Sequence, residues 1–356
     1  MVHAVDAMNG SIGGGGGSDV RFFAEMRLFI EARFHRGPVL NHRPLKLDKP
    51  GLMEDKKRTH YLLPYVLLTL SSLFWAGNWV TGRALRDAFG PLALSFWRWF
   101  IAAAVLAPFV WPAARAQWPV IRRHWKPVAT LSLCSVVLFQ SFVYVGLRST
   151  TAINAVLLNS CIPLAIMGCA WVVDRERATL RQMLGMALSF AGILVIVARG
   201  DVARLADIGF NSGDFWILAA MPVWAMYSVL LKRKPAELSG MTLVFILSVM
   251  GLFVLAPAYV VEMLWIPQRV PALEAVAGVV YIGLFASVAA LACWNAGVAR
   301  VGANIAGFTV HLLPLFGTLL AIFFLGESLH MFHVVGFAGI LAGVALATLS
   351  RRKNGG

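Results

Sequence analysis

The chain carries one apolar stretch twice, because residues 127–200 reappear as residues 278–351 almost without gaps at a shift of 151 positions. The residues that fall on one another at this shift include Gly146 and Gly297, Pro163 and Pro314, Glu176 and Glu327, and Gly192 and Gly343. A second match, at a shift of 149, precedes the first in each copy and places Trp75 on Trp224. A duplicated and strongly apolar sequence is typical of integral membrane proteins built from internal repeats.

The hydrophobic residues gather in ten blocks, each about as long as a helix that crosses a bilayer. Only 13% of the residues are charged and 59% are hydrophobic, whereas a soluble domain carries about 25% charged residues. A helix of about 20 residues crosses ~30 Å of hydrocarbon. The ten predicted spans are residues 61–82, 91–111, 127–147, 151–173, 179–198, 213–231, 241–261, 275–298, 303–325 and 332–349. We therefore expect an all-α integral membrane protein with ten transmembrane helices.

The net charge of +14 does not predict a nucleic-acid partner, because the lysines and arginines lie in loops between the predicted spans. With the N-terminus in the cytoplasm, fourteen of them fall on the inner side, within residues 115–126, 175–181, 232–234, 300 and 351–353. Six fall on the outer side, at Arg83, Arg86, Arg148, Arg199, Arg204 and Arg269. This bias predicts that both termini are cytoplasmic. We expect the protein in the cytoplasmic (inner) membrane of a bacterium.

Residues 1–58 differ from the rest of the chain. They contain consecutive glycines at Gly13–Gly17, scattered basic residues and no sustained helical period. Two interpretations remain open: a disordered cytoplasmic tail, or a segment wrongly assigned to a protein whose translation begins at Met53. No short apolar region of the kind that forms a cleavable signal peptide precedes the first predicted span.

The sequence lacks the motifs of common enzymes and metal sites. The four cysteines, Cys134, Cys161, Cys169 and Cys293, lie within predicted spans and show no metal-ligand spacing. Neither a nucleotide-binding glycine loop nor a GxSxG elbow is present. We expect no metal, no cofactor and no enzymatic activity. The enzymatic alternative is an intramembrane serine protease that uses Ser228 or Ser287 with His311.

Each copy of the repeat holds five spans, and the copies cover residues 61–200 and 213–350. Since five is odd, the second copy must enter the membrane from the opposite side, which predicts two inverted five-helix repeats related by a pseudo-two-fold axis in the membrane plane. Exchange of roles between such halves produces an inward-open and an outward-open state. The pattern thus predicts a transporter that works by alternating access, with its site near the midplane.

Several motifs over residues 61–350 resemble the EamA-type branch of the drug/metabolite transporter superfamily. They are FWAGNWV at Phe74–Val80, the arginine of SFWRWFIAA, Pro163 and Pro314 with the acidic turns at Glu176 and Glu327, and the glycine-rich fifth and tenth spans. The resemblance implies an exporter or exchanger of small metabolites such as amino acids. It also implies a central cavity lined by spans 1, 3, 4, 6, 8 and 9. A monomer suffices for such a mechanism, and a dimer is the alternative.

The positions of the charged residues narrow the expected solute. All 17 Asp and Glu residues lie in the tail, in loops or at span ends, so the sequence offers no buried carboxylate for proton coupling or for a cationic solute. We expect a neutral, zwitterionic or anionic solute. Arg98 lies well inside the second span. It either anchors a substrate carboxylate or phosphate, or snorkels to the surface, or stacks on Trp97 or Trp99 and bonds backbone carbonyls.

His311 lies deep in the ninth span, three residues before Pro314. Histidine titrates near neutral pH, so this side chain either carries or senses a proton at the substrate site. The alternative is a structural hydrogen bond to the carbonyl of a neighbouring helix. Pro163 and Pro314 are expected hinges, since a proline within a span frees a carbonyl and permits a kink.

The other predicted substrate-binding residues are amides and aromatic groups on the expected cavity helices: Trp75, Asn78, Trp79, Gln140, Tyr144, Asn159, Trp224 and Tyr227. Amides in lipid bond either across helices or to a solute. Aromatic walls suit flat, partly apolar solutes, although inherited packing is the alternative for Trp75 and Trp224. The glycines of spans 5 and 10 predict close helix contact within the chain.

Two other functions remain open. A flippase-like carrier of a lipid-linked or amphipathic solute needs a lateral opening between helices. A non-transporting membrane scaffold or receptor moves no solute at all, and the duplicated odd repeat favours transport over it.

Overall fold

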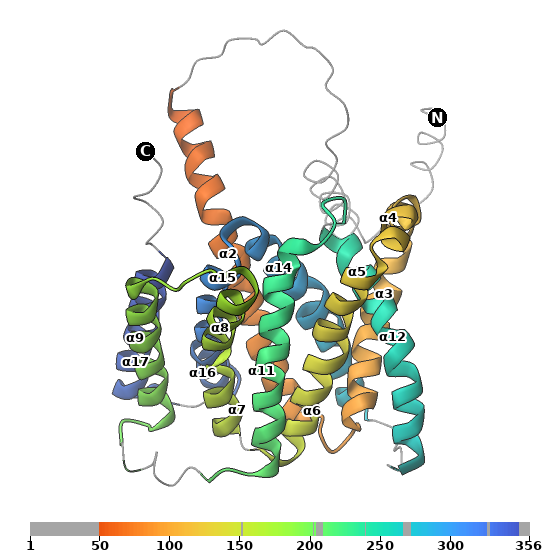
Figure 1. Ribbon diagram of the computed structural model, residues 1–356. Helices are drawn as coiled ribbons and strands as arrows, with labels where there is room; N and C mark the ends of the chain where they lie inside the picture. The colour runs from red at the N-terminus through yellow and green to blue at the C-terminus, as the bar shows by residue number, and fades with distance from the viewer. Residues whose placement is uncertain are drawn as a thin grey trace, which may run out of the picture. The chain divides into compact units, whose positions relative to one another are not determined.

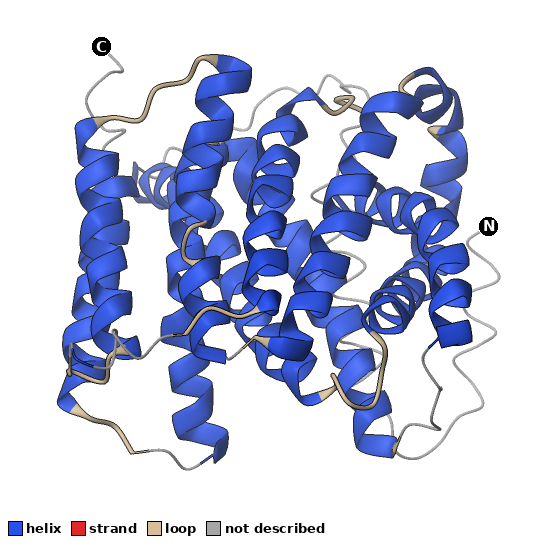
Figure 2. Cartoon of the chain, turned by 60° about the horizontal axis from the view of Figure 1, so that its bottom comes forward, coloured by secondary structure: helices blue, strands red, loops and turns tan. Residues whose placement is uncertain are grey.

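The structure is a computed structural model that describes residues 50–150, 152–201, 203, 209–238, 240–265, 272–325 and 328–348. Within these ranges all regular secondary structure is helical (Figure 2). The predicted all-α class is therefore confirmed for the described chain. Residues 1–49 of the predicted tail and the acidic turn at Glu327 lie outside the described residues.

The helices follow the two sequence repeats (Figure 1). Those of the first repeat are α2 (Pro50–Ala84), α3 (Pro91–Ala116), α4 (Trp118–Arg123), α5 (Trp125–Ser132), the π-helix η1 (Leu133–Leu138), α6 (Phe139–Ser149), α7 (Ala152–Asn159), α8 (Ile162–Asp174) and α9 (Leu180–Val197). Those of the second are α11 (Ser212–Leu230), the 3₁₀-helix η2 (Leu231–Arg233), α12 (Gly240–Trp265), α13 (Leu273–Tyr281), the π-helix η3 (Ile282–Ala289), α14 (Ala290–Val301), α15 (Ala303–Phe308), the 3₁₀-helix η4 (Thr309–His311), α16 (Leu312–Leu325) and α17 (Met331–Thr348).

Within the described residues, nine helical segments are long and apolar enough to cross a membrane, and they lie at nine of the ten predicted positions. The exception is the first predicted span, 61–82. It is helical as part of α2, which begins earlier than predicted, at Pro50. It carries polar residues at Ser71, Ser72 and Asn78 that lower its mean hydropathy.

The fifth and tenth spans, α9 and α17, lie side by side (Figure 1) because glycines remove side chains from their contact. A Cβ atom added to Gly185 would lie 2.6 Å from the carbonyl oxygen of Gly343, and one added to Gly192 would lie 2.6 Å from that of Gly336. These partners follow one another in opposite order along the chain, so the two helices are antiparallel. The predicted close contact within the chain is confirmed.

The second and seventh spans, α3 and α12, form another pair of repeat counterparts. Glu262, near the end of α12, accepts hydrogen bonds from the backbone N–H groups of Leu92 (3.0 Å) and Ala93 (2.8 Å). Its carboxylate thereby satisfies free donors in the first turn of α3 and lies at the positive end of the helix dipole. Phe96 stacks on Tyr259 with ring centroids 5.1 Å apart. Each of the two pairs thus joins helices that correspond in the sequence repeat.

Four of the remaining spans are interrupted at equivalent places in the two repeats. The third and eighth spans contain the π-helices η1 and η3, which overlap when the sequence is shifted by 151. In the fourth span α7 ends at Asn159 and α8 begins at Ile162, and in the ninth span η4 separates α15 from α16. Such interruptions leave backbone carbonyls free and cluster at functional sites.

Aromatic rings fill the space where these interrupted spans meet. Trp75 packs edge-on against Trp224 with ring centroids 5.0 Å apart, and Trp294 lies 5.3 Å from Trp75 and 5.6 Å from Trp224. Phe139 and Tyr227 lie 4.8 Å and 5.1 Å from Trp224. Large rings bury much apolar area and carry polar edges that hydrogen-bond, so this cluster both closes the core and borders a candidate site.

Candidate functional site

A small cavity of about 20 Å³ adjoins the aromatic cluster. This volume holds about one water molecule. Its walls come from spans 1, 3, 4, 6 and 9 and consist of Trp75, Asn78, Trp79, Phe139, Gln140, Val143, Asn159, Ile162, Trp224, Val310 and Leu313. Six of the ten predicted substrate-binding residues are in this wall. The other four, Arg98, Tyr144, Tyr227 and His311, lie outside it and contact its members or their neighbours.

Arg98 on α3 is 1% exposed and donates hydrogen bonds to neutral groups of three segments. Its acceptors are Ser287 Oγ (2.6 Å), Asn78 Oδ1 (3.0 Å), Gln140 Oε1 (2.9 Å), the Tyr144 hydroxyl (2.9 Å) and the Ala286 carbonyl (3.0 Å). Its Cζ atom also lies 5.2 Å from the centre of the Trp99 ring. Two of the predicted features, ring stacking and a backbone carbonyl partner, are therefore present. The guanidinium ties α3 to α2, α6 and η3.

The partners that η3 supplies were missed by sequence reasoning. The Ala286 carbonyl accepts from both Trp75 Nε1 (3.0 Å) and Arg98 Nη2 (3.0 Å). Ser287 Oγ donates to the Ile282 carbonyl five residues earlier (3.0 Å). A π-helix changes the backbone register and so frees carbonyls that a regular α-helix uses. The sequence IGLFASVA contains no proline or polar break that would mark this change.

Two tyrosine–asparagine hydrogen bonds occupy equivalent places with their residue types exchanged. Tyr144 donates to Asn78 Oδ1 (3.1 Å) between spans 3 and 1, and Tyr227 donates to Asn295 Oδ1 between spans 6 and 8. At shifts of 149 and 151, Asn78 corresponds to Tyr227 and Tyr144 to Asn295. The same bond therefore closes both halves, and Asn295 was missed as a partner.

The polar groups around the first of these bonds are not duplicated. Arg98 and Gln140 correspond to Leu247 and Leu291 in the second repeat, and both leucines are buried. A scaffold that needed the charge for folding would need it in both copies. The repeat symmetry of the scaffold therefore does not require Arg98 and Gln140.

His311 lies in η4 and is fully buried. Its Nε2 is 2.9 Å from the Ser160 carbonyl oxygen, and its Nδ1 contacts Ser189 Oγ. A carbonyl only accepts, so the hydrogen-bond network assigns a proton to Nε2. The Ser189 hydroxyl beside Nδ1 also lies 3.0 Å from the Met186 carbonyl oxygen, to which it can donate. Ser160 is the repeat counterpart of His311 at a shift of 151. The predicted hinges Pro163 and Pro314 each follow this contact by three residues.

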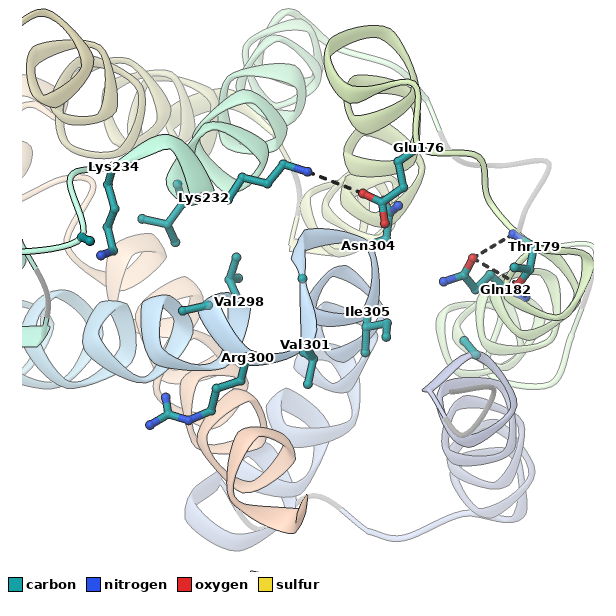
Figure 3. Close-up of a pocket in the computed structure, with 15 residues that line it drawn as sticks. Glu176, Thr179, Gln182, Lys232, Lys234, Val298, Arg300, Val301, Asn304 and Ile305 are labelled. Carbon is teal, nitrogen blue, oxygen red and sulfur yellow. Dashed lines mark hydrogen bonds and ion pairs between the residues drawn. The ribbon is translucent and has the colours of Figure 1, made fainter. Parts of the chain in front are cut away.

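A larger pocket of about 770 Å³, which we call the vestibule, opens at the end of the helices where η2 and α14 finish (Figure 3). Lys232 points toward Glu176 in this pocket and pairs with it at 3.7 Å. Asn304, also in its wall, is 4% exposed, and its Oδ1 has no hydrogen-bond partner within the described chain. Burial lowers the pKa of the Lys234 ammonium, although the charge of Glu237 raises it. Sequence reasoning named none of these residues as part of a site.

The opposite ends of the helices are held together by hydrogen bonds. Arg83, at the end of α2, donates to the carbonyls of Leu147 (2.7 Å) and Thr150. The Thr150 hydroxyl donates to Asp214 Oδ1, and Asn154 Nδ2 donates to Asp214 Oδ2 (2.8 Å). These bonds join the ends of α2 and α6 to the start of α11.

The described residues contain no group of three or more His, Cys, Asp or Glu side chains that could hold a metal ion.

A family comparison identifies the chain. The sequence model of the EamA-like transporter family matches residues 62–198 and again residues 211–349. The chain belongs to this family. The two matches fall on the two sequence repeats, so the protein is an integral membrane protein of a transporter family with two EamA units.

Individual relatives extend over most of the chain. An uncharacterized transporter of Archaeoglobus fulgidus is 27% identical over 291 residues, which cover 81% of this chain and 98% of that protein. The uncharacterized transporter YyaM of Bacillus subtilis is 24% identical over 288 residues, or 80% of this chain and 93% of that protein. A probable terminal-alkyne amino-acid exporter of Streptantibioticus cattleyicolor is 28% identical over 295 residues, or 80% and 94%.

A solved crystal structure shares the fold. It superimposes with a TM-score of 0.63 at 22% sequence identity and covers 80% of this chain and 96% of the solved chain.

Proposed function

We propose that this EamA-like protein exports or exchanges small metabolites such as amino acids by alternating access, with the solute bound in the central cavity. The observation that carries the proposal is the convergence of indole rings and amides where two interrupted helices meet, between the two EamA units. Interrupted helices are typical of transporter substrate sites near the midplane. The relative named as a probable amino-acid exporter supports this class of solute.

The proposal includes ten transmembrane helices, with α2 as the first, arranged as two inverted five-helix repeats. A residue on a two-fold axis touches its own counterpart. Trp75 contacts its counterpart Trp224, and His311 contacts its counterpart Ser160. These two contacts support a pseudo-two-fold axis that passes through the aromatic cluster and the helix breaks.

The pairing of α9 with α17 supports the same axis. At a shift of 151, Gly185 corresponds to Gly336 and Gly192 to Gly343. Exchange of the two halves therefore turns the contact between Gly185 and Gly343 into a contact between Gly336 and Gly192. Both contacts are present in the structure. Antiparallel helices related by a two-fold axis across them meet in this crosswise manner.

The difference between the two ends supports alternating access. Arg83 closes one end by binding the carbonyls of Leu147 and Thr150. Lys232 is its counterpart at a shift of 149. Instead of binding the counterpart carbonyls at the end of α14, Lys232 pairs with Asp174 (2.6 Å) and with Glu176, and the vestibule occupies the gap. We propose that transport exchanges these two arrangements.

We further propose that the vestibule faces the cytoplasm, so that the structure represents an inward-open state with both termini inside a bacterial cytoplasmic membrane. Ala347, in the last turn of α17, lines the vestibule. The basic residues Lys232, Lys234 and Arg300 also line it, as the positive-inside rule expects of a cytoplasmic end. A pocket on this side suits a carrier that loads its solute from the cytoplasm, and a monomer contains every part named.

Within this mechanism, the cavity of about 20 Å³ enlarges when a solute enters. The six wall residues then contact the solute, and the other four hold them in place. Arg98 and Tyr144 bond Asn78, Tyr227 packs on Trp224, and His311 bonds the residue next to Asn159. Pro163 and Pro314 are the hinges beside the axis.

Counterflow in liposomes tests the proposal. The purified full chain is reconstituted, and exchange of labelled amino acids and small organic acids is measured with and without a pH gradient. Saturable counterflow of one solute supports a carrier, and its dependence on the gradient reveals proton coupling. Folded protein that exchanges nothing across a broad panel would contradict the proposal.

A further inference from the structure

We infer that Asn78 and Gln140 select the solute by binding a carboxylate group through their amide N–H groups, and that Arg98 acts as the residue that positions both amides. The inference deepens the proposed transport function and rests on it for the location of the solute. It differs from direct anchoring by Arg98, because the guanidinium is not in the cavity wall.

Arg98 determines which way the two amides face. A guanidinium is only a donor, whereas an amide has an accepting oxygen and a donating NH₂ group. Arg98 Nη1 lies 3.0 Å from Asn78 Oδ1 and 2.9 Å from Gln140 Oε1, and Tyr144 also donates to the Asn78 oxygen. Both amide oxygens are therefore committed, and each amide offers a solute its NH₂ group.

These NH₂ groups remain available at the cavity. Asn78 and Gln140 both line it. Neither amide nitrogen has a hydrogen bond to a described residue. Neither nitrogen is among the fully enclosed atoms that lack a partner, so each keeps some accessible surface. The Nδ2 of Asn295 provides the contrast, since it is enclosed and unpaired. The free surface of the Asn78 and Gln140 nitrogens is thus provided by the cavity.

The charge of Arg98 makes these donors selective for an anion. Its hydrogen-bond partners are all neutral, so a buried positive charge stands next to the cavity without a carboxylate bonded to it. The buried carboxylates of the described spans, Asp214 and Glu262, are bonded at the span ends. A low-dielectric site with a positive charge and two N–H donors favours an anion and disfavours a cation. Indole walls and two donors suit the planar carboxylate.

The test compares acids with their carboxamides on the full chain. The probes are benzoate and benzamide, and leucine and leucinamide. Binding is measured as the shift in melting temperature of the detergent-solubilised protein, because a ligand that binds the folded state stabilises it. Counterflow in liposomes is measured in parallel. We expect the wild-type protein to bind the acids at least tenfold more tightly than the carboxamides.

Asn78→Asp and Gln140→Glu are the decisive variants. Each keeps the oxygen that Arg98 binds and replaces the NH₂ donor by an anionic oxygen, so each is expected to lose at least tenfold in acid binding while carboxamide binding persists. Gln182→Glu is the matched control. It adds the same charge in the vestibule wall, where a glutamate still completes the capping box with Thr179, so acid preference is expected to remain.

The positioning role of Arg98 has its own readout. Arg98→Gln removes the charge and is expected to bring the ratio of acid to carboxamide binding near one, and Arg98→Lys to restore part of the ratio. A purely structural role would lower the melting temperature and leave the ratio unchanged.

The remaining outcomes also decide the inference. Equal binding of acids and carboxamides, no binding of any acid, or an acid preference retained in Asn78→Asp and Gln140→Glu would each overturn it. If neither variant folds, the wild-type comparison decides. Acid-selective binding without counterflow would contradict the proposed transport alone, and counterflow without acid preference would contradict the inference alone.

Discussion

The two tyrosine–asparagine bonds differ in what surrounds them. Asn78 Oδ1 accepts from Arg98 as well as from Tyr144, whereas Asn295 has Tyr227 as its described side-chain partner and an unpaired Nδ2. Removal of a partner from a buried polar group costs about 1–3 kcal/mol, and hydrogen bonds in membrane proteins average about 0.6 kcal/mol. We expect Tyr227→Phe to lower the free energy of unfolding by about 1–2 kcal/mol. Tyr144→Phe also removes an acceptor of the buried Arg98 charge, so we expect it to cost more, about 2–3 kcal/mol.

Unfolding by a denaturing detergent, followed by circular dichroism, measures both variants under one set of conditions. A larger loss in Tyr227→Phe than in Tyr144→Phe would show that the bond between Arg98 and Tyr144 adds nothing to stability.

The sequence identified the unusual residues of the site and three of the groups that Arg98 bonds, Asn78, Gln140 and Tyr144, but not the partners that η3 supplies. Arg98 and His311 stand out because a charged or titratable side chain within a span is rare, and the structure buries both. Ser287, which Arg98 contacts, is 189 positions away in the chain. Its approach depends on how η3 packs against α3, and a single sequence with its periodicity contains no signal for that contact.

At the scale of helices, the α9–α17 contact permits a sharp test. In Gly185→Ala the new methyl group would lie 2.6 Å from the Gly343 carbonyl oxygen and 2.8 Å from the Ala347 nitrogen. Overpacking of this kind costs about 1–3 kcal/mol, so we expect a loss of that size in the free energy of unfolding.

Gly168→Ala makes the same change in α8, where no atom lies within 4 Å of the new methyl group. Alanine is the better helix former by roughly 0.5–1 kcal/mol, so this control is expected to be neutral or stabilising. Similar losses in both variants, measured by thermal unfolding in detergent, would mean that close α9–α17 packing is not what the glycine preserves.

At the scale of helices, nine of the spans could be predicted from the sequence because their hydropathy is high. The first predicted span has a lower mean hydropathy because α2 carries Ser71, Ser72 and Asn78 into the core together with Trp75. The π-helices were not predicted, since a π-turn shifts the helical register only slightly and requires no particular residue. Proline did mark the helix breaks at Pro163 and Pro314.

For the molecule as a whole, the hydrogen bonds of Arg83 should stabilise the state in which the vestibule is open. Arg83→Leu removes its bonds to Leu147 and Thr150. We expect the population to move toward the state with the vestibule closed. A cysteine placed at Ile305, which lines the vestibule, should then react severalfold more slowly with a membrane-impermeant thiol reagent.

Glu237→Cys is the control. Glu237 is exposed and lies at the same end of the molecule but outside the vestibule wall, so a cysteine at this position should react at the same rate with and without Arg83→Leu. An unchanged rate at Ile305→Cys in the Arg83→Leu background, with the protein still folded, would disconnect Arg83 from the opening of the vestibule.

The contact between Trp75 and its identical counterpart Trp224 has a consequence for the energetics of the proposed cycle. If the halves exchange roles, a contact between two identical repeat counterparts is carried onto itself by the two-fold axis, and it favours neither state. Any preference for one resting state must then arise where duplication has been followed by divergence, as at Arg83 and Lys232 or at Arg98 and Leu247. Under the proposed cycle, the resting state is therefore set by the sequence differences between the two repeats.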